Sequence, residues 1–103
     1  DAAALKQRID AGEKVFLLDV RRPDELAEHG MIEGAVNIPI DDLETRLAEV
    51  PKDVPIVTYC MRGGRASTAA KLLREKGYEQ PIEFGGITEW KEAGLPVVEP
   101  KSE

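Results

Sequence analysis

The sequence holds one cysteine and one histidine among its 103 residues, and this scarcity excludes several kinds of site. A single cysteine cannot form a disulfide within the chain, and there is no cysteine–histidine cluster of the kind that binds zinc. We therefore predict neither a metal site nor an organic cofactor. Any disulfide or persulfide chemistry must run through Cys60 and end on another molecule.

Long apolar runs and clusters of basic residues are also missing. No apolar run approaches the roughly 20 residues that span a bilayer, and no basic, apolar leader is present. The formal net charge is −6, and no basic stripe is available to neutralise phosphates. We therefore predict that neither a membrane nor a nucleic acid is a partner. We expect a cytoplasmic location, or a periplasmic one if a leader has been removed from a chain that begins at Asp1 without methionine.

What the sequence does contain is ordinary for a globular protein, with 42% hydrophobic and 33% charged residues. Its length suits one domain with one modest core. We place this domain at residues 1–98 and predict a flexible C-terminal tail at 99–103.

Short strand and helix patterns alternate along the domain. Apolar runs of strand length occur at 15–20, 54–59 and 81–84. Amphipathic or helix-forming segments occur at 2–11, 23–29, 43–50, 66–76 and 88–93. This alternation indicates an α/β fold, in which a central parallel sheet carries helices on both faces. Because sites in such folds form at the carboxyl ends of strands, we expect one immediately after residue 59.

Cys60 lies where the second strand gives way to a glycine-rich loop and then to a helix. Gly63 and Gly64 allow successive amides to turn inward, and a helix N-terminus favours anions. Arg62 and Arg65 add positive charge on either side of the loop. A buried, inert thiol is the plain alternative. Because these surroundings stabilise a thiolate, we predict instead that Cys60 is a nucleophile within an anion pocket.

Polar residues near this loop each have two interpretations. Asp19 is either a structural carboxylate, bonded to loop amides or to Arg21, or a brace for the active-site loop. We prefer the brace to a catalytic role, because a second negative charge would destabilise a thiolate. Ser67, or its neighbour Thr68, either donates to the thiolate or to a bound anion, or caps the helix. His29 is either a general base or, as we prefer, an exposed residue at a helix end.

Four blocks of the sequence resemble the rhodanese family of sulfurtransferases. In order they are 17–21 (LLDVR), 33–39 (EGAVNIP), the Cys-x4-Arg loop from Cys60 to Arg65, and 85–90 (GGITEW) with 93–97 (AGLPV). The chain departs from these relatives at 30–35, where they commonly have Gly-His-Ile-Pro-Gly-Ala and where its only histidine is displaced to position 29. The resemblance implies a three-layer α/β/α sandwich with a central parallel sheet of about five strands.

The resemblance also implies a double-displacement mechanism. Cys60 would take the outer sulfur of a small anionic donor such as thiosulfate and hold it as a persulfide. The sulfur would then pass to cyanide or to a thiol acceptor, which we expect to be glutathione, thioredoxin or a protein cysteine. The residues that would bind the donor and stabilise the persulfide are Met61, Arg62, Gly63, Gly64 and Arg65.

Two other functions stay open. Related phosphatases and arsenate reductases have a loop one residue longer, Cys-x5-Arg, so the length of this loop disfavours their chemistry. A rhodanese-like domain can also serve a larger protein, either as a non-catalytic module or as a sulfur relay. Thiosulfate treatment distinguishes these cases, since a reactive module gains one sulfur atom on Cys60 and a scaffold gains none.

Overall fold

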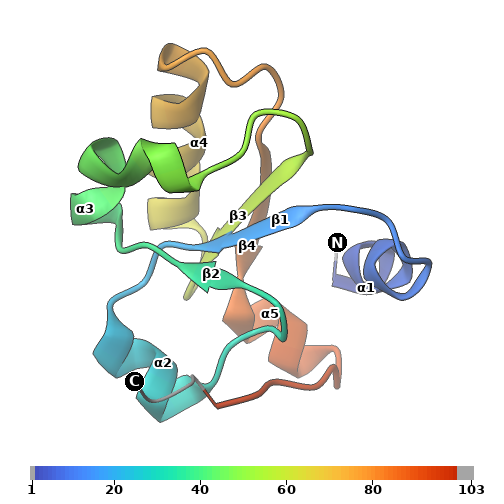
Figure 1. The fold of residues 1–103 in the computed structure, drawn as a ribbon. Coiled ribbons are helices and arrows are strands. Elements are labelled where there is room, and N and C mark those ends of the chain that lie inside the picture. The colour runs from blue at the N-terminus through green and yellow to red at the C-terminus, as the bar shows by residue number, and fades with distance from the viewer. Residues whose placement is uncertain (1, 100–103) are drawn as a thin grey trace.

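The computed structural model describes residues 2–99, and at its centre is a parallel sheet in the strand order β2-β1-β3-β4 (Figure 1). The strands are β1 (Phe16–Asp19), β2 (Val36–Asn37), β3 (Ile56–Cys60) and β4 (Ile82–Gly86). This confirms the predicted fold class. The resemblance implies about five strands, whereas the described residues form a sheet of four. From residue 100 on, the tail predicted at 99–103 lies outside the described residues.

Helices cover both faces of this sheet. They are α1 (Ala2–Asp10), α2 (Pro23–His29), α3 (Ile40–Leu43), the 3-10 helix η1 (Glu44–Glu49), α4 (Gly64–Glu75) and α5 (Ile87–Glu92). In Figure 1, α3, η1 and α4 lie on one side of the sheet, and α1 and α5 lie on the other. The arrangement is the predicted three-layer sandwich.

Alternation along β3 divides its side chains between two cores. Ile56 and Cys60 pack with the apolar residues of α3 and α4. Val57 and Tyr59 pack with those of α1 and α5. Successive side chains of a strand point to opposite faces of the sheet, and all of β3 is buried. Cys60 therefore faces the same layer as the helix that follows it.

Trp90 anchors the layer formed by α1 and α5. Its side chain is buried, and its Nε1 donates a hydrogen bond to the Pro96 carbonyl over 2.7 Å. The ring of Phe84 meets it edge-on, with 6.1 Å between the centroids. Edge-on aromatic pairs add to the stabilisation that burial provides. Trp90 is thus a core residue in a protein with few aromatic side chains.

The helix predicted over 43–50 is wrong in its bounds and in its type. The chain instead forms one α-helical turn, which begins at Ile40, followed by the 3-10 helix η1. The Tyr78 hydroxyl donates to the carbonyl oxygens of Leu47 and Val50 over 3.2 and 2.6 Å. These carbonyls therefore have a partner from another part of the chain, and the segment need not extend as an α-helix to satisfy them.

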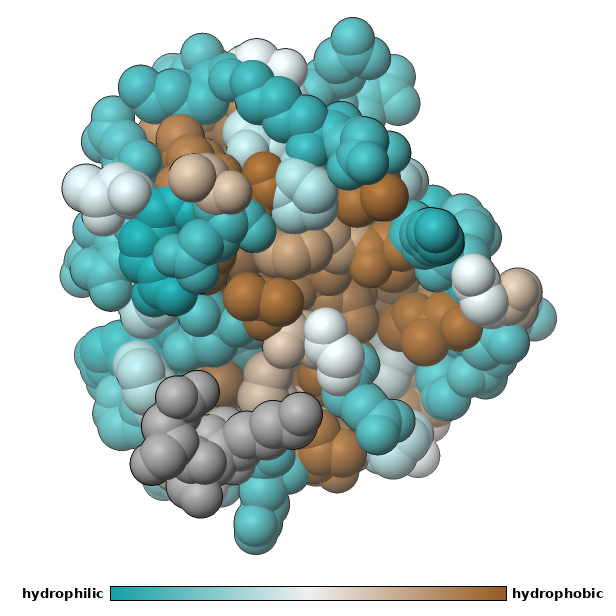
Figure 2. Space-filling view, viewed as in Figure 1, coloured by the Kyte–Doolittle hydropathy of each residue, from teal (hydrophilic) through white to brown (hydrophobic). Residues whose placement is uncertain are grey.

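The edge strand β2 limits how much open sheet the molecule presents. Figure 2 shows the face that carries β2, where hydrophobic residues gather in the centre and hydrophilic residues surround them. β2 has only two residues, and Val36 within it is 36% exposed. Short edge strands of this kind restrict pairing with other chains.

Within residues 2–99, no helix has the length and apolar character needed to cross a bilayer.

Candidate active site

Cys60 is the last residue of β3, at the carboxyl end of the sheet, and α4 begins at Gly64. Gly63 turns the chain between them with φ of +124°, a conformation that side chains disfavour. A Cβ at Gly63 would lie 3.4 Å from the Cα of Gly85, which is ordinary van der Waals contact, so the backbone conformation and not a lack of space favours glycine there. The strand, loop and helix predicted around Cys60 are confirmed, although the helix begins two residues earlier than predicted.

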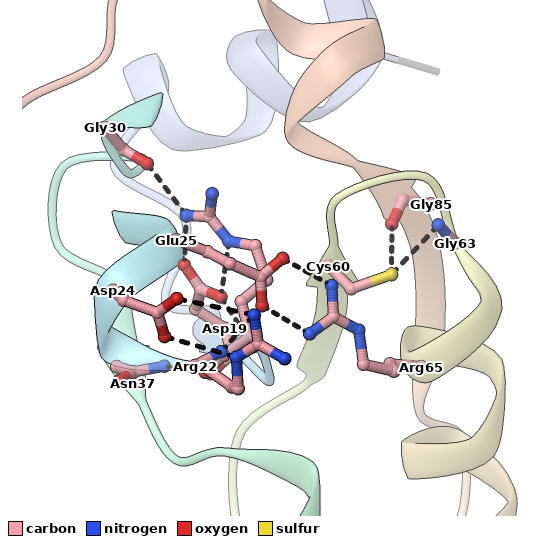
Figure 3. A network of polar contacts seen from close by, with 11 residues as sticks. Asp19, Arg22, Asp24, Glu25, Gly30, Asn37, Cys60, Gly63, Arg65 and Gly85 are labelled. Atoms are coloured by element: carbon pink, nitrogen blue, oxygen red, sulfur yellow. Dashed lines mark hydrogen bonds and ion pairs between the residues drawn. The ribbon is translucent and has the colours of Figure 1, made fainter. Parts of the chain in front are cut away.

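The sulfur of Cys60 lies between this loop and β4 (Figure 3). The Gly63 N–H donates to Sγ over 2.9 Å. The thiol in turn donates to the Gly85 carbonyl, 3.7 Å away, and the residue as a whole is 1% exposed. Within the described chain, Gly63 supplies the one loop amide that hydrogen-bonds the sulfur. The amides of Gly64 and Arg65 lie in the first turn of α4, where a helix offers them no internal acceptor.

The loop is fastened on its other side by β4 and α5. The Thr88 N–H donates to the Met61 carbonyl over 3.2 Å. Gly86 is the neighbour of Cys60 in the register of the two strands. A Cβ at Gly86 would lie 2.0 Å from the same Met61 carbonyl oxygen. Only glycine fits there, and its small size sets how closely the loop approaches the sheet.

Arg65 is held by Glu25 of α2. Its Nη1 and Nη2 donate to the two carboxylate oxygens over 2.5 and 2.7 Å. Figure 3 shows the guanidinium between Glu25 and the loop that carries Cys60. The hydrogen bonds from Arg65 lower the pKa of Glu25 from 4.5 to about 2, and the carboxylate raises the pKa of Arg65. Such bidentate pairs are among the stronger polar contacts, so Arg65 has a fixed position.

Glu25 is the residue of this site that the sequence analysis missed. The helix dipole alone explains an acidic residue in the first turn of α2. The Oε1 of Glu25 also accepts a hydrogen bond from the Arg22 N–H over 3.0 Å, and this contact caps the helix. Its partner Arg65 is 40 positions further along the chain. No local pattern connects two residues so far apart.

Arg62 differs from Arg65 in having no such partner. It is exposed, and it forms no ion pair with any residue in the described range 2–99. Both arginines are predicted to bind the donor. The structure holds one of them against a carboxylate and leaves the other open to solvent.

Asp19 and Arg21 form a buried ion pair next to α2. Arg21 donates to Asp19 through Nε over 2.9 Å and through Nη2 over 2.6 Å, and Nη2 also donates to the Gly30 carbonyl over 2.8 Å. Its Nη1 has no hydrogen-bond partner among the described residues. The guanidinium carbon lies 5.6 Å from the centroid of the Tyr59 ring, and burial raises the pKa of Tyr59. Through the Gly30 carbonyl the pair fixes the end of α2, the helix that carries Glu25, and within residues 2–99 the two side chains make no hydrogen bond to the loop at 61–65.

Ser67 and His29 make no hydrogen bond to the sulfur within residues 2–99. Ser67 is exposed in the first turn of α4, where its N–H donates to the Gly63 carbonyl over 2.9 Å. Its hydroxyl makes no hydrogen bond to Cys60 among the contacts of the described chain. His29 is the last residue of α2, and its Nε2 lies 3.9 Å from the Glu28 carboxylate. This position agrees with the helix-end interpretation of His29.

Metal-binding side chains do not gather near this loop. Across residues 2–99, no three histidine, cysteine, aspartate or glutamate side chains lie close enough together to hold a metal ion. The chemistry visible at the site is that of a thiol with an N–H donor on its sulfur. Fold and site together define an α/β protein that presents one cysteine at the carboxyl end of a central strand.

Comparison with known proteins identifies the family. The model of the rhodanese-like domain family matches residues 1–93. A sulfurtransferase of Allochromatium vinosum is 39% identical over 102 residues, which cover 98% of this chain and 94% of that protein. A mitochondrial thiosulfate sulfurtransferase of Saccharomyces cerevisiae is 35% identical over an alignment of 103 positions, which covers 86% of this chain and 68% of that protein. The chain belongs to the rhodanese-like domain family.

A solved structure shows the same fold. The crystal structure of a rhodanese-related protein from Thermoplasma volcanium superimposes with a TM-score of 0.83 at 36% identity, covering 94% of this chain and 93% of that one. The resemblance noted in the sequence is therefore confirmed at the level of family and fold.

Proposed function

We propose that the protein is a sulfurtransferase that carries sulfane sulfur as a persulfide on Cys60. The observation behind this proposal is the 2.9 Å hydrogen bond from the Gly63 N–H to Sγ, at the start of a helix of 12 residues. An N–H donor and the positive end of a helix stabilise an anionic sulfur, whether it is a thiolate or a persulfide. Relatives that are named sulfurtransferases support the same assignment.

In the first step, the Cys60 thiolate attacks the outer sulfur of a small anionic donor such as thiosulfate. An S–S bond forms on Cys60, the S–S bond of thiosulfate breaks, and sulfite leaves with the bonding electron pair. The outer sulfur keeps its own negative charge and becomes the anionic end of the persulfide, while the charge of the thiolate leaves with sulfite. The name of the yeast relative supports thiosulfate as the donor.

In the second step, the acceptor attacks the outer sulfur. Cyanide is the acceptor in the assay, and glutathione, thioredoxin or a protein cysteine is the acceptor that we propose for the cell. The new bond forms to the acceptor, the S–S bond on Cys60 breaks, and Cys60 leaves as the thiolate. The Gly63 N–H is already placed to stabilise that leaving sulfur.

The two arginines of the loop have separate parts in this scheme. Arg62, exposed and unpaired among the described residues, binds the sulfonate end of the donor. Arg65 keeps a fixed positive charge beside the loop while it is bound to Glu25. The remaining loop residues, Met61, Gly63 and Gly64, contribute through the main chain.

Two measurements on the Cys60→Ser variant test the proposal. We expect thiosulfate-to-cyanide turnover, followed as thiocyanate, to fall by roughly a thousandfold or more when the nucleophile is lost. We also expect intact-mass spectrometry to find one added sulfur atom on the wild-type protein after thiosulfate treatment and none on the variant. Circular dichroism of the variant checks that it is folded. Turnover that survives the substitution would refute the proposal.

Hydrolysis of an aryl phosphate, measured on the same preparation, separates the proposal from phosphatase chemistry. We expect no hydrolysis that depends on Cys60, because the Cys-x4-Arg loop is one residue shorter than the phosphatase loop. Cys60-dependent hydrolysis without any sulfur loading would assign the site to phosphate. The absence of both reactions would leave a binding module.

A further inference from the structure

An open pocket of about 350 Å³ adjoins the Cys60 loop on the side of α5. Its lining includes residues of α5, the helix that directly follows β4 at the carboxyl edge of the sheet (Figure 1). Three parts of the chain meet there, and the lining residues that matter for its chemistry are His29, Met61, Arg62, Thr88, Lys91 and Glu92.

The pocket is joined to the loop of Cys60 by the chain itself. Met61 and Arg62, which form one of its walls, are the two residues that follow Cys60. The bond from the Thr88 N–H to the Met61 carbonyl fastens this wall to α5 over 3.2 Å. The Nζ of Lys91 lies 3.4 Å from the His29 carbonyl, to which it donates, and this contact connects α5 with the end of α2. The wall formed by Met61 and Arg62 is therefore continuous with the loop that follows Cys60.

The charges around the pocket favour an anion. Arg62 and Lys91 are both exposed, and neither forms an ion pair within the described part of the chain. Glu92 is the one carboxylate of the lining, so the two cations leave a positive balance. On a chain with a formal net charge of −6, a local positive site of this kind attracts anionic ligands.

We infer that this pocket binds the sulfur acceptor, and that the acceptor is a small thiol that carries carboxylate groups. The inference rests on the proposed function, because it presupposes a persulfide on Cys60. Ligand sites for small organic molecules have volumes of about 300–1,000 Å³, and the pocket lies at the lower end of that range. Thiosulfate, with five heavy atoms, would fill only part of it. A protein acceptor would need an interface of about 800 Å² on each partner, so a pocket of this kind suits a small molecule better.

In the reaction, carboxylates of the acceptor pair with Arg62 and Lys91, and its thiolate attacks the outer sulfur of the persulfide. An S–S bond forms on the acceptor, the S–S bond on Cys60 breaks, and Cys60 keeps the electron pair. The acceptor leaves as a persulfide, and no oxidant or reductant is consumed.

Single-turnover transfer from the loaded protein tests this inference. Wild-type protein is loaded with thiosulfate, desalted, and mixed with glutathione, which carries carboxylates, or with dithiothreitol, which does not. Loss of the added sulfur is followed by mass spectrometry. We expect Lys91→Glu to lower the ratio of the glutathione to the dithiothreitol rate constant by roughly fivefold to tenfold, since an attraction becomes a repulsion. Added salt should lower the same ratio in the wild type.

Lys14→Glu is the matched control. Lys14 is an exposed lysine before β1, outside the pocket, and its reversal changes the net charge by the same amount. We expect the ratio to stay within about twofold of the wild type in this variant. A ratio that Lys91→Glu leaves unchanged would overturn the inference, as would faster transfer to thioredoxin that depends on Lys91 while transfer to glutathione does not. Failure to load any sulfur would instead refute the proposed function, so the two failures are distinguishable.

Discussion

Replacing Glu25 by glutamine should lower the free energy of unfolding by about 1–2 kcal/mol at neutral pH. The fall in the pKa of Glu25 from 4.5 to about 2 corresponds to roughly 3 kcal/mol, at 1.36 kcal/mol per pH unit. The Arg65 side chain is 33% exposed, so water screens the pair and the measured effect should be smaller. Glutamine keeps the size of the side chain and one acceptor oxygen, but it loses the negative charge and the second oxygen that together bind Nη1 and Nη2 of Arg65.

The same reasoning gives the sign of the pH dependence. A carboxylate whose pKa is lower in the folded state stabilises the protein above its unfolded pKa, and this contribution is lost as the pH falls through the folded value. For Glu25 the window runs from 4.5 down to about 2. The difference in stability between the wild type and Glu25→Gln should therefore be largest at pH 7 and should shrink below pH 4.5.

Urea denaturation of both proteins at pH 7, pH 4 and pH 3 measures this difference. Glu28→Gln is the matched control, because Glu28 lies on the same helix, is 74% exposed and, within residues 2–99, has one ion-pair contact, with His29 at 3.9 Å. We expect that control to change stability by less than about 0.5 kcal/mol. In Glu25→Gln, kcat/KM for thiosulfate should also fall, because Arg65 loses its fixed position. Equal stability losses at pH 7 and pH 3, or no loss at pH 7, would show that the ion pair does not contribute as argued.

Two further substitutions test the packing around the site. Gly86→Ala should destabilise the protein by more than about 3 kcal/mol or prevent folding, because its Cβ would lie 2.0 Å from the Met61 carbonyl oxygen. Gly64→Ala, with nothing within 4 Å of the added Cβ, should cost little in the same thermal-unfolding measurement. Asp19→Asn should cost about 3–5 kcal/mol in urea denaturation, since it leaves Arg21 charged in a fully buried pair. A loss below about 1 kcal/mol would contradict the buried pair.

The strand, loop and helix around Cys60 are predictable from the sequence because each is specified locally. An apolar run marks β3, helix formers mark α4, and a positive-φ turn between them needs a glycine such as Gly63. The boundaries shift by one or two residues, since Cys60 belongs to the strand and the helix begins at Gly64. The segment at 43–50 is predicted less well, because its form depends on hydrogen bonds from the distant Tyr78 hydroxyl.

The electrostatics of the site are less accessible to sequence reasoning. The sequence predicts positive charge from both Arg62 and Arg65, yet within residues 2–99 a carboxylate of α2 pairs with Arg65 and not with Arg62. This difference between the two arginines depends on where α2 lies relative to the start of α4. The buried pair of Asp19 and Arg21 helps to set the position of α2. Long-range placement of this kind has no local pattern, so it becomes visible only in the folded chain.

Burial of the sulfur bears on the order of the two proposed steps. Cys60 is 1% exposed, so a bulky acceptor has poor access to a free thiolate at this position. An S–S bond is about 2.0 Å long, so loading places the transferable sulfur that much further from the Cys60 Sγ. Loading would thus make the sulfur easier to reach for a thiol bound beside Arg62. The same burial that protects the unloaded cysteine therefore favours donor before acceptor, which is the sequence that double displacement requires.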